Sequence, residues 1–385
     1  MERSKRDAVI VEAVRTPIGK RGKTLSQVRA DDLAATILQE VVRRAGIEPR
    51  LVEDVIMGCS TPIDEQGANV GRFAVLISGF PAEVPAVTIN RMCASSDQAA
   101  HYGSQAIEVG DVDIVIAAGI ESMSRVPMAS DSGRLSPRVL ERYRIIPQGN
   151  SAELMAQRWD LKRMELDEYS LQSHERALTA KSEGRFDAEI VPVEVPLPDG
   201  GTELFAEDEG PRADTSMDFM AGLKSAFQEN GRITAGNSSQ MSDGAAAVLL
   251  MAREKAEELG LRPRARIAGR VSVGSDPTLQ LSGPITATRR VLERKGLKLE
   301  DLDVIEVNEA FASVVLAWAR ELQPDMSRVN PNGGAIALGH PLGATGARLM
   351  TTMLHELERQ QGRYGLQTMC IGHGLANATL IEREP

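Results

Sequence analysis

The sequence is poor in cysteine and in aromatic residues, and it contains no long apolar run. Three of its 385 residues are cysteine and 3% are aromatic. Cys59, Cys93 and Cys370 are odd in number and far apart, which excludes a disulfide framework of the kind that small secreted domains use. We therefore expect a reducing, cytoplasmic setting, in which free thiols are candidate nucleophiles. No stretch approaches about eighteen uninterrupted apolar residues, so no membrane span is predicted.

The chain also lacks an excess of positive charge. It has 44 Lys and Arg residues against 54 Asp and Glu residues, for a net charge of −10. Nucleic-acid binding needs clustered positive charge, so this balance argues against nucleic acid as a partner. A small anionic ligand held by a local basic patch is still compatible with it. The length suffices for roughly two to three domain-sized cores.

What the sequence does contain is an alternation of strands and helices. The first half is predicted to hold strands at 8–14, 52–57, 87–90 and 113–118 and helices at 31–45 and 94–109. The second half repeats this order, with helices at 286–295 and 347–359 and strands at 302–307 and 366–371. Continuous apolar strands separated by helices are typical of a parallel sheet covered on both faces. Two such halves bring equivalent loops together at the strand ends, where α/β sheets bind ligands.

The pattern changes between the two halves. Residues 122–241 combine short helices, a proline-rich strand and many charges, and we interpret them as an inserted loop domain. We expect residues 1–121 to form the N-terminal half, completed by about 242–264, and residues 265–385 to form the C-terminal half. The inserted region begins with a run of arginines that either contact phosphates or form a solvated surface: Arg125, Arg134, Arg138, Arg142 and Arg144.

A glycine-rich stretch, residues 330–346, surrounds a single histidine. Five glycines in seventeen residues argue against an ordinary helix or strand, because glycine loses the most backbone entropy on folding. His340 is the one ionisable side chain in this stretch, and Pro341 stiffens the chain directly after it. The pattern indicates a loop that holds an imidazole in place. The alternative is a turn that happens to contain a histidine.

Cys93 lies between a predicted strand and a predicted helix. The positive end of the helix dipole lowers a thiol pKa, but by less than about one unit, so most of the thiol stays protonated at pH 7. A nucleophilic role therefore needs a base, and His340 is the best candidate. Asp97, one helical turn further on, is expected to face the sulfur and oppose ionisation. A buried structural cysteine is the alternative.

Two further segments place polar groups at the ends of apolar strands. Cys370 precedes Gly372 and Gly374, where freed backbone amides are suited to receive an oxyanion. Asn308 and Glu309 follow the strand at 302–307, and each needs a partner or a ligand unless it caps a helix. No pair of cysteines and histidines has the close spacing of zinc ligands, so we predict no metal site. A Walker phosphate loop is also absent from the sequence.

These segments together resemble one enzyme family. Four segments are, in order and spacing, similar to the signatures of the thiolases: Asn90-Arg91-x-Cys93-Ala94-Ser95, Asn308-Glu309-Ala310-Phe311-Ala312, Gly339-His340-Pro341-Leu342-Gly343-Ala344-Thr345-Gly346 and Cys370-x-Gly372. The similarity runs from Ala8 to Arg383 and is strongest to the bacterial degradative 3-ketoacyl-CoA thiolases.

The resemblance implies a thiolase-like α/β fold. In such a fold, two similar βαβαβαββ halves form a five-layered α-β-α-β-α arrangement, with an inserted loop domain that binds coenzyme A. It also implies a homodimer or homotetramer, with no tightly bound cofactor. Coenzyme A is then a co-substrate, and 3-ketoacyl-CoA and acetyl-CoA are the other partners. Neither nucleic acid nor a membrane is expected to bind.

The resemblance further implies a ping-pong mechanism in fatty-acid β-oxidation. Cys93, activated by His340, attacks the 3-keto carbon, and Cys370 protonates the departing acetyl-CoA carbanion. His340 and a water held by Asn308 stabilise the enolate, and the amides of Cys93 and Gly372 hold the oxyanion on the acyl group. The matching positions for coenzyme A are Ser239 near the pantetheine, and Arg212 and Phe227 near the adenine.

The sequence departs from the family pattern at several positions. Ser96 and Asp97 stand where glycine and an apolar residue are usual, which predicts an altered acyl pocket. His373 replaces part of a glycine-rich run, and Gln280 stands where some relatives have methionine. Two alternatives to thiolytic cleavage therefore stay open: biosynthetic condensation of two acetyl-CoA, and a non-catalytic acyl-CoA or lipid carrier.

Overall fold

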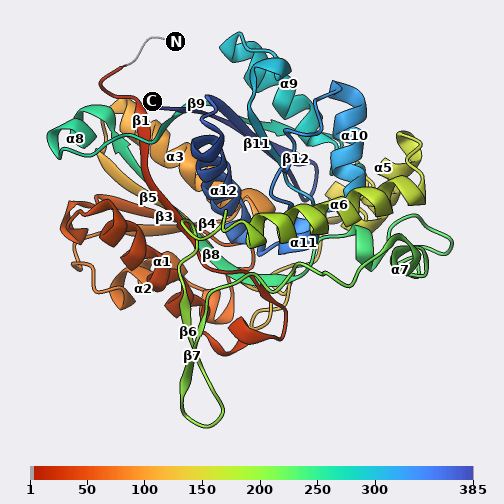
Figure 1. Ribbon diagram of the computed structural model, residues 1–385, viewed down its shortest axis with the longest axis horizontal. Helices are drawn as coiled ribbons and strands as arrows, with labels where there is room; N and C mark the ends of the chain where they lie inside the picture. Colours follow the sequence, from red (N-terminus) through yellow and green to blue (C-terminus); the bar gives the residue numbers. More distant parts are fainter. Residues whose placement is uncertain (1–3, 385) are drawn as a thin grey trace.

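A computed structural model describes residues 4–384 and contains one large mixed sheet (Figure 1). Its strand order is β10-β11-β12-β9-β1-β8-β5-β3-β4, and the short β2 pairs with β8. The strands are β1 (Ala8–Arg15), β2 (Gly19–Lys20), β3 (Asp54–Gly58), β4 (Ala86–Ile89), β5 (Ile114–Ser122), β8 (Ser242–Ala252), β9 (Ala265–Gly274), β10 (Val304–Val307), β11 (Tyr364–Ile371) and β12 (Leu375–Arg383).

The two halves of this sheet have the same topology. In the first half, β4, β3 and β5 are parallel, and β8 and β1 continue the sheet in antiparallel pairs. In the second half, Val329 bridges in parallel to β10, β10 is parallel to β11, and β12 and β9 follow in antiparallel pairs. The repeat expected from the sequence is therefore present. The halves join where Val9 and Ile10 of β1 pair with Arg266 and Ala265 of β9.

Helices form three layers around the sheet. The central layer is α3 (Ser95–Val109) and α12 (Thr345–Gln360), which share a buried apolar core with strands of both halves. The helices α1 (Ala30–Ala45) and α2 (Val70–Ile77) belong to the first half, and α9 (Gly283–Lys295) and α10 (Ala312–Leu322) to the second. This is the α-β-α-β-α layering that the family resemblance implies.

Glycines terminate the matching helices α1 and α9 in the same way. Gly46 and Gly296 adopt left-handed backbone conformations, with φ of 70° and 65°, and their amides bond back to the last helical turn. Glycine adopts this conformation without a Cβ penalty, so both helices end where the sequence predicts. The predicted strands and helices of both halves are present, with bounds shifted by a few residues.

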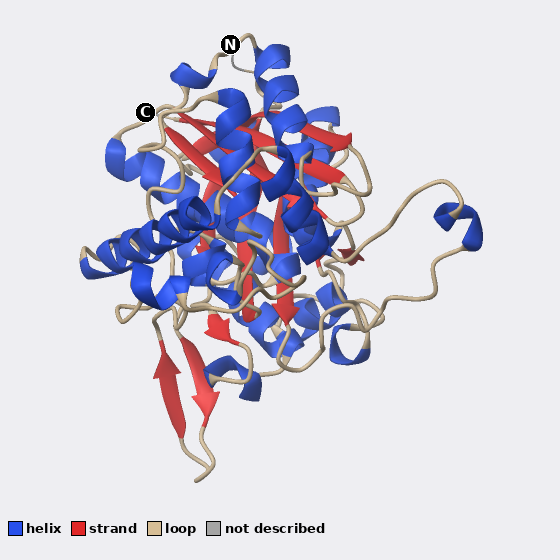
Figure 2. Ribbon diagram, turned by 90° about the vertical axis from the view of Figure 1, so that its right-hand side faces the viewer, coloured by secondary structure: helices blue, strands red, loops and turns tan. Residues whose placement is uncertain are grey.

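The region between β5 and β8 is less regular. It contains α4 (Pro137–Leu140), α5 (Gln148–Arg158), α6 (Arg163–Ser182), α7 (Met217–Ala221), and a hairpin of β6 (Val193–Pro196) and β7 (Thr202–Phe205) that extends away from the body (Figures 1 and 2). The remaining helices are α8 (Arg253–Glu258) and α11 (Ala335–Leu338). The chain division at residues 121, 241 and 264 stays a prediction.

The glycine-rich stretch is more ordered than the sequence suggests. It contains the four-residue α11 and a 3-10 turn at Leu342–Ala344, and α12 begins at Thr345. All of its residues from Asn332 to Gly346 are buried. The prediction of no ordinary helix therefore holds only for the segments around Gly333 and Gly339, where φ is 75° and 112°.

Candidate active site

Cys93 lies in a 3-10 turn (Met92–Ala94) that leads directly into α3. Its side chain is buried, and the backbone amides of Cys93 and Gly372 lie close enough to the sulfur to favour its ionised form. Burial raises the pKa of the thiol to about 12, and the Glu121 carboxyl adds to this effect. The free thiol is therefore protonated at neutral pH and needs a base.

Cys370 ends the buried strand β11. Burial raises the pKa of its thiol well above the ordinary value, and the charge on Cys93 contributes, because the two sulfurs lie close enough to interact. The 3-10 turn that carries Cys93 also packs against β11. A Cβ atom on Gly372 would lie 2.8 Å from Met92 Sδ, so glycine allows this close approach. The structure thus brings both predicted cysteines to one site.

His340 is held from both sides of its ring. Nδ1 lies 2.7 Å from Thr345 Oγ1, and the Thr345 hydroxyl donates its own proton to the Pro341 carbonyl at 2.8 Å. Nδ1 must therefore carry the ring proton, which leaves Nε2 as the basic nitrogen. Nε2 lies 3.3 Å from Asn308 Nδ2. Burial, together with the nearby Arg348, lowers the pKa of His340 to about 3, so the imidazole is neutral.

The backbone before His340 depends on glycine. Gly339 has a φ of 112°, and a Cβ atom there would lie 2.2 Å from Ser242 Oγ. The His340 amide then donates to the Gln240 carbonyl at 3.0 Å. The turn after His340 packs against the turn that carries Cys93, and Leu342 and Cys93 share one apolar cluster.

Asn308 follows β10, and its side chain is buried. Its Oδ1 has no hydrogen-bond partner among residues 4–384. A buried amide oxygen needs a donor, so this atom fits the water that the family resemblance assigns to Asn308. The other polar residue of this segment, Glu309, instead accepts hydrogen bonds from Tyr169, Ser173 and Asn330 and stabilises the scaffold.

Ser96 and Asp97 do not act as the sequence suggested. Ser96 is fully buried, and its hydroxyl accepts a hydrogen bond from the Ala347 amide at 2.9 Å, in the first turn of α12. Asp97 Oδ1 accepts from Gln367 at 2.5 Å and from Thr379 at 2.6 Å, both in the C-terminal half. The carboxyl that opposes ionisation of Cys93 is that of Glu121. Ser96 and Asp97 therefore connect the two halves.

Three residues that position the candidate site were not identified from the sequence. They are Thr345, Glu121 and Gly119. Glu121 accepts hydrogen bonds from the amides of Ser60 and Gly343, both at 2.8 Å, and a Cβ on Gly119 would lie 2.3 Å from the Gly343 carbonyl oxygen. Thr345 lies within the family signature but carries no pattern of its own. Glu121 follows the strand predicted at 113–118, and an acid directly after an apolar run was the one available signal.

The predicted coenzyme A positions lie in or beside the loop domain. Arg212 lines a cavity together with residues of α7 and the segment near Gly236, and Ser239 lies nearby, its amide bonded to the Ala310 carbonyl. Phe227 packs edge-on against Phe311, with ring centroids 5.9 Å apart. Arg125, the first of the arginine run, binds Glu65 at 2.5 Å and 3.0 Å, so it is structural.

A second hollow, with a volume of about 370 Å³, lies beside His373. Its lining is mostly apolar: Leu135, Val139, Tyr143, Ile145, Ser275, Pro277 and His373. Gln280 supports this loop, because its Oε1 accepts from the His373 amide at 2.9 Å and its Nε2 donates to the Ile146 carbonyl at 2.6 Å. The hollow therefore adjoins the loop that carries Gly372.

The part of the chain that the structure describes holds neither a metal-binding cluster nor a membrane-spanning helix. No group of three or more His, Cys, Asp or Glu residues there is placed to hold a metal ion. None of the described helices is both long enough and apolar enough to cross a membrane.

Comparison with known proteins identifies the family of this chain. The thiolase N-terminal domain model matches residues 8–254, and the thiolase C-terminal domain model matches residues 261–383. A steroid 3-ketoacyl-CoA thiolase of Mycobacterium tuberculosis is 48% identical over 390 residues, covering 98% of this chain and 94% of that protein. A 3-ketoacyl-CoA thiolase of Bacillus subtilis is 43% identical, covering 98% and 99%. The crystal structure of a Bacillus anthracis acetyl-CoA acetyltransferase is 40% identical, with a TM-score of 0.92 over 98% of this chain and 99% of that one.

The fold is that of a CoA-dependent acyltransferase, and the chain belongs to the thiolase family. The structural similarity confirms the thiolase fold expected from the sequence. The family and these relatives support a thiolytic, degradative activity on 3-ketoacyl-CoA.

Proposed function

We propose that this protein cleaves 3-ketoacyl-CoA with coenzyme A through an acyl-enzyme on Cys93. The observation that carries the proposal is that the amides of Cys93 and Gly372 converge on the Cys93 sulfur, next to Cys370. An acyl carbonyl attached to that sulfur would place its oxygen near both donors. Preorganised amides of this kind stabilise the oxyanion of acyl transfer.

In the first half-reaction, His340 Nε2 accepts the Cys93 proton as the sulfur attacks the 3-keto carbon. The bond between C2 and C3 of the substrate then breaks, which leaves an acyl thioester on Cys93 and an acetyl-CoA enolate. A water bound to Asn308, together with His340, stabilises the enolate oxygen. Cys370 donates its proton to the C2 carbanion, and acetyl-CoA leaves.

In the second half-reaction, the Cys370 thiolate takes the proton of incoming coenzyme A. The coenzyme A thiolate attacks the Cys93 thioester, and the shortened acyl-CoA forms. The Cys93 thiolate recovers its proton from His340, so the starting state is restored. Each cysteine thus has one role: Cys93 carries the acyl group and Cys370 carries the proton.

Substrate binding follows from the two cavities. Arg212, Phe227 and Ser239 are assigned to coenzyme A on the family resemblance, and the cavity lined by Arg212 supports this. The apolar hollow beside His373 favours a bulky or ring-bearing acyl group over acetyl, in line with the steroid substrate that the name of the Mycobacterium tuberculosis relative implies. The relative named acetyl-CoA acetyltransferase keeps biosynthetic condensation as the second candidate.

The assembly is proposed to be a homodimer or homotetramer in the cytoplasm. The strand β4 lies at one edge of the sheet, and its Val87 is exposed. The neighbouring helix α2 exposes Phe73, Leu76 and Ile77. An exposed edge strand beside an apolar helix face is suited to pairing with a second copy.

The proposed direction is tested by steady-state thiolysis over a series of 3-ketoacyl-CoA substrates, including a ring-bearing one. Thiolysis with a higher kcat/KM for long or ring-bearing acyl groups than for acetoacetyl-CoA supports the proposal. Turnover restricted to acetoacetyl-CoA favours the biosynthetic candidate instead. Size-exclusion chromatography with light scattering tests the assembly, and a monomer would contradict it.

A further inference from the structure

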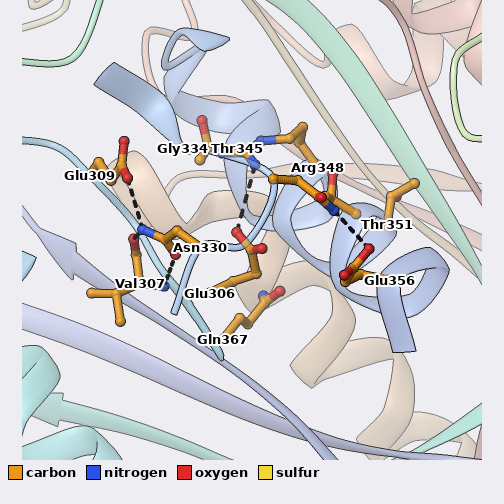
Figure 3. A network of polar contacts seen from close by, with 12 residues as sticks. Glu306, Val307, Glu309, Asn330, Gly334, Thr345, Arg348, Thr351, Glu356 and Gln367 are labelled. Atoms are coloured by element: carbon orange, nitrogen blue, oxygen red, sulfur yellow. Dashed lines mark hydrogen bonds and ion pairs between the residues drawn. The ribbon is translucent and has the colours of Figure 1, made fainter. Parts of the chain in front are cut away.

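Arg348 and Glu306 form a buried ion pair that makes no hydrogen bonds within residues 4–384 (Figure 3). Arg348 in α12 and Glu306 in β10 are 1% and 0% exposed, and Arg348 Nη1 lies 4.0 Å from Glu306 Oε2. Within the described chain, neither oxygen of Glu306 and none of the three guanidinium nitrogens has a hydrogen-bond partner. A guanidinium stays protonated in a protein, and an uncompensated buried charge is costly. The packing of β10 against α12 therefore has to hold these two side chains together.

Most charged groups around Arg348 and Glu306 are bound to other residues. Arg348 also faces Glu189, Asp208 and Arg15, but Arg15 binds Asp208 at 2.8 Å and one oxygen of Glu189 at 2.6 Å. Glu306 also faces the carboxyls of Glu309, Glu189 and Glu356. Glu309 is bound to Tyr169 and Ser173, and Glu356 is bound to Arg359. Among residues 4–384, Glu306 is thus the acid near Arg348 with both oxygens open to it. Burial raises the pKa of Glu306 to about 8, and the charge on Arg348 opposes this rise. Their open donors and acceptors are of the kind that ordered buried water satisfies.

The pair connects the same two elements that hold the imidazole. Strand β10 carries Glu306, and Asn308 follows two residues later, on the same face of the chain. Helix α12 carries Thr345 and, one turn on, Arg348, which lie on one side of the helix. His340 contacts Asn308 with Nε2 and Thr345 with Nδ1. The ion pair therefore joins β10 and α12, the two elements whose residues Asn308 and Thr345 contact the histidine.

The charge on Arg348 also acts on the ring. Besides burial, it is the group that lowers the pKa of His340, because a cation nearby disfavours a second positive charge. Within residues 4–384, no hydrogen bond or ion pair joins Arg348 to Cys93 or Cys370. Its effect on the two thiols would therefore pass through His340. The mechanism described above makes no use of either Arg348 or Glu306.

We propose that Arg348, held in place by Glu306, is a positioning residue that keeps His340 an uncharged base for Cys93. The proposal rests on the proposed function of His340. The cation makes the imidazolium a transient species, which readily returns its proton when Cys93 leaves the acyl group. Loss of the cation would make His340 more basic without touching any reacting atom.

The test is the rate at which iodoacetamide alkylates Cys93, measured by peptide mass spectrometry from pH 3 to 8 in the whole protein. Arg348→Met removes the charge, and Arg348→Lys keeps it. Should Arg348→Met leave Glu306 too poorly paired to fold, the double change Arg348→Met with Glu306→Leu replaces the pair by apolar groups, which buried pairs often tolerate. His340→Asn gives the rate without the base.

The charge-removing variants are expected to alkylate faster than the wild type at pH 7. The fall of their rate toward acid is expected to begin roughly one pH unit higher, because a more basic imidazole is protonated at higher pH. Arg348→Lys is expected to follow the wild-type curve. Two outcomes would reduce the pair to a structural role and overturn the inference. In the first, Arg348→Met alkylates more slowly but its rate has the same pH dependence as the wild type. In the second, Arg348→Lys and Arg348→Met give the same curve of alkylation rate against pH. A wild-type rate in His340→Asn would overturn the base role as well.

Discussion

The Nδ1 atom of His340 lies 2.7 Å from Oγ1 of Thr345, whose hydroxyl proton is already donated to the carbonyl of Pro341. This relay fixes the tautomer of the ring and directs the basic nitrogen toward Asn308. It is built within five residues, where the glycine-rich loop turns into α12. The start of α12 and the proposed base therefore form one structural unit.

Replacement of Thr345 by valine is expected to lower kcat for thiolysis by roughly 10-fold. That is less than the ~10²–10⁴-fold loss expected when a general base is removed, because the imidazole stays in place but loses its fixed tautomer. Thr345→Ser keeps the hydroxyl and serves as the matched control. Steady-state kinetics at saturating substrate measure the effect, and equal kcat values for the two variants would contradict the relay.

The contact between Ser96 and the Ala347 amide predicts a stability effect. Ser96→Ala leaves a buried amide of the first turn of α12 without its acceptor, which costs about 1–3 kcal/mol. Urea unfolding of the purified protein measures this loss. Ser132→Ala, at an exposed position, is the control and is expected to unfold like the wild type. If the two variants unfold at the same urea concentration, Ser96 does not join the halves.

Gly339 is expected to tolerate no side chain. Gly339→Ala would place a Cβ 2.2 Å from Ser242 Oγ and force alanine to a φ of 112°, so a destabilisation above about 2 kcal/mol is expected. Gly274→Ala is the matched control, because its φ is not positive and nothing lies within 4 Å of the added atom. Thermal unfolding compares the two. A wild-type Tm for Gly339→Ala would show that the loop can adopt another backbone path.

The pH dependence of stability follows from the neutral histidine. The folded-state pKa of His340, about 3, is below its unfolded value near 6.5, so only the unfolded state takes up this proton between those pH values. Stability from this group is present above pH 6.5 and is lost as the pH falls. Between pH 7 and 5 the loss amounts to roughly 2 kcal/mol. His340→Asn lacks the group and is expected to lose that much less, as measured by urea unfolding at both pH values. An identical loss in both proteins would contradict the buried neutral ring.

Much of this fold was readable from the sequence because its strands are continuous apolar runs between helices. The ends of α1 and α9 were predicted from Gly46 and Gly296, which cap both helices in the left-handed conformation. The repeat between the halves was also predicted, from the strands at 52–57 and 302–307 onward. The pairing of β1 with β9, which joins the two halves, had no sequence signal, because it depends on which edges meet.

The candidate site was only partly readable. Cys93, His340 and Cys370 were identified by type and motif. The contacts that arrange them are long-range, such as those of Glu121 with Gly343 and of Ser96 with Ala347. Asp97 shows the limit most clearly. Helical spacing suggested that it faced Cys93, whereas its carboxylate is bound to Gln367 and Thr379 of the other half.

The most direct test of the account is single-turnover mass spectrometry after addition of acetyl-CoA to the wild type, Cys93→Ala and Cys370→Ala. The account predicts an acetyl group on Cys93 in the wild type and none in Cys93→Ala. In Cys370→Ala it predicts an acetyl group on Cys93 with thiolysis blocked, because the nucleophile remains and the proton carrier is gone. No acetyl group on the wild type would point to a carrier, and normal turnover by Cys370→Ala would contradict the division of roles between the two sulfurs.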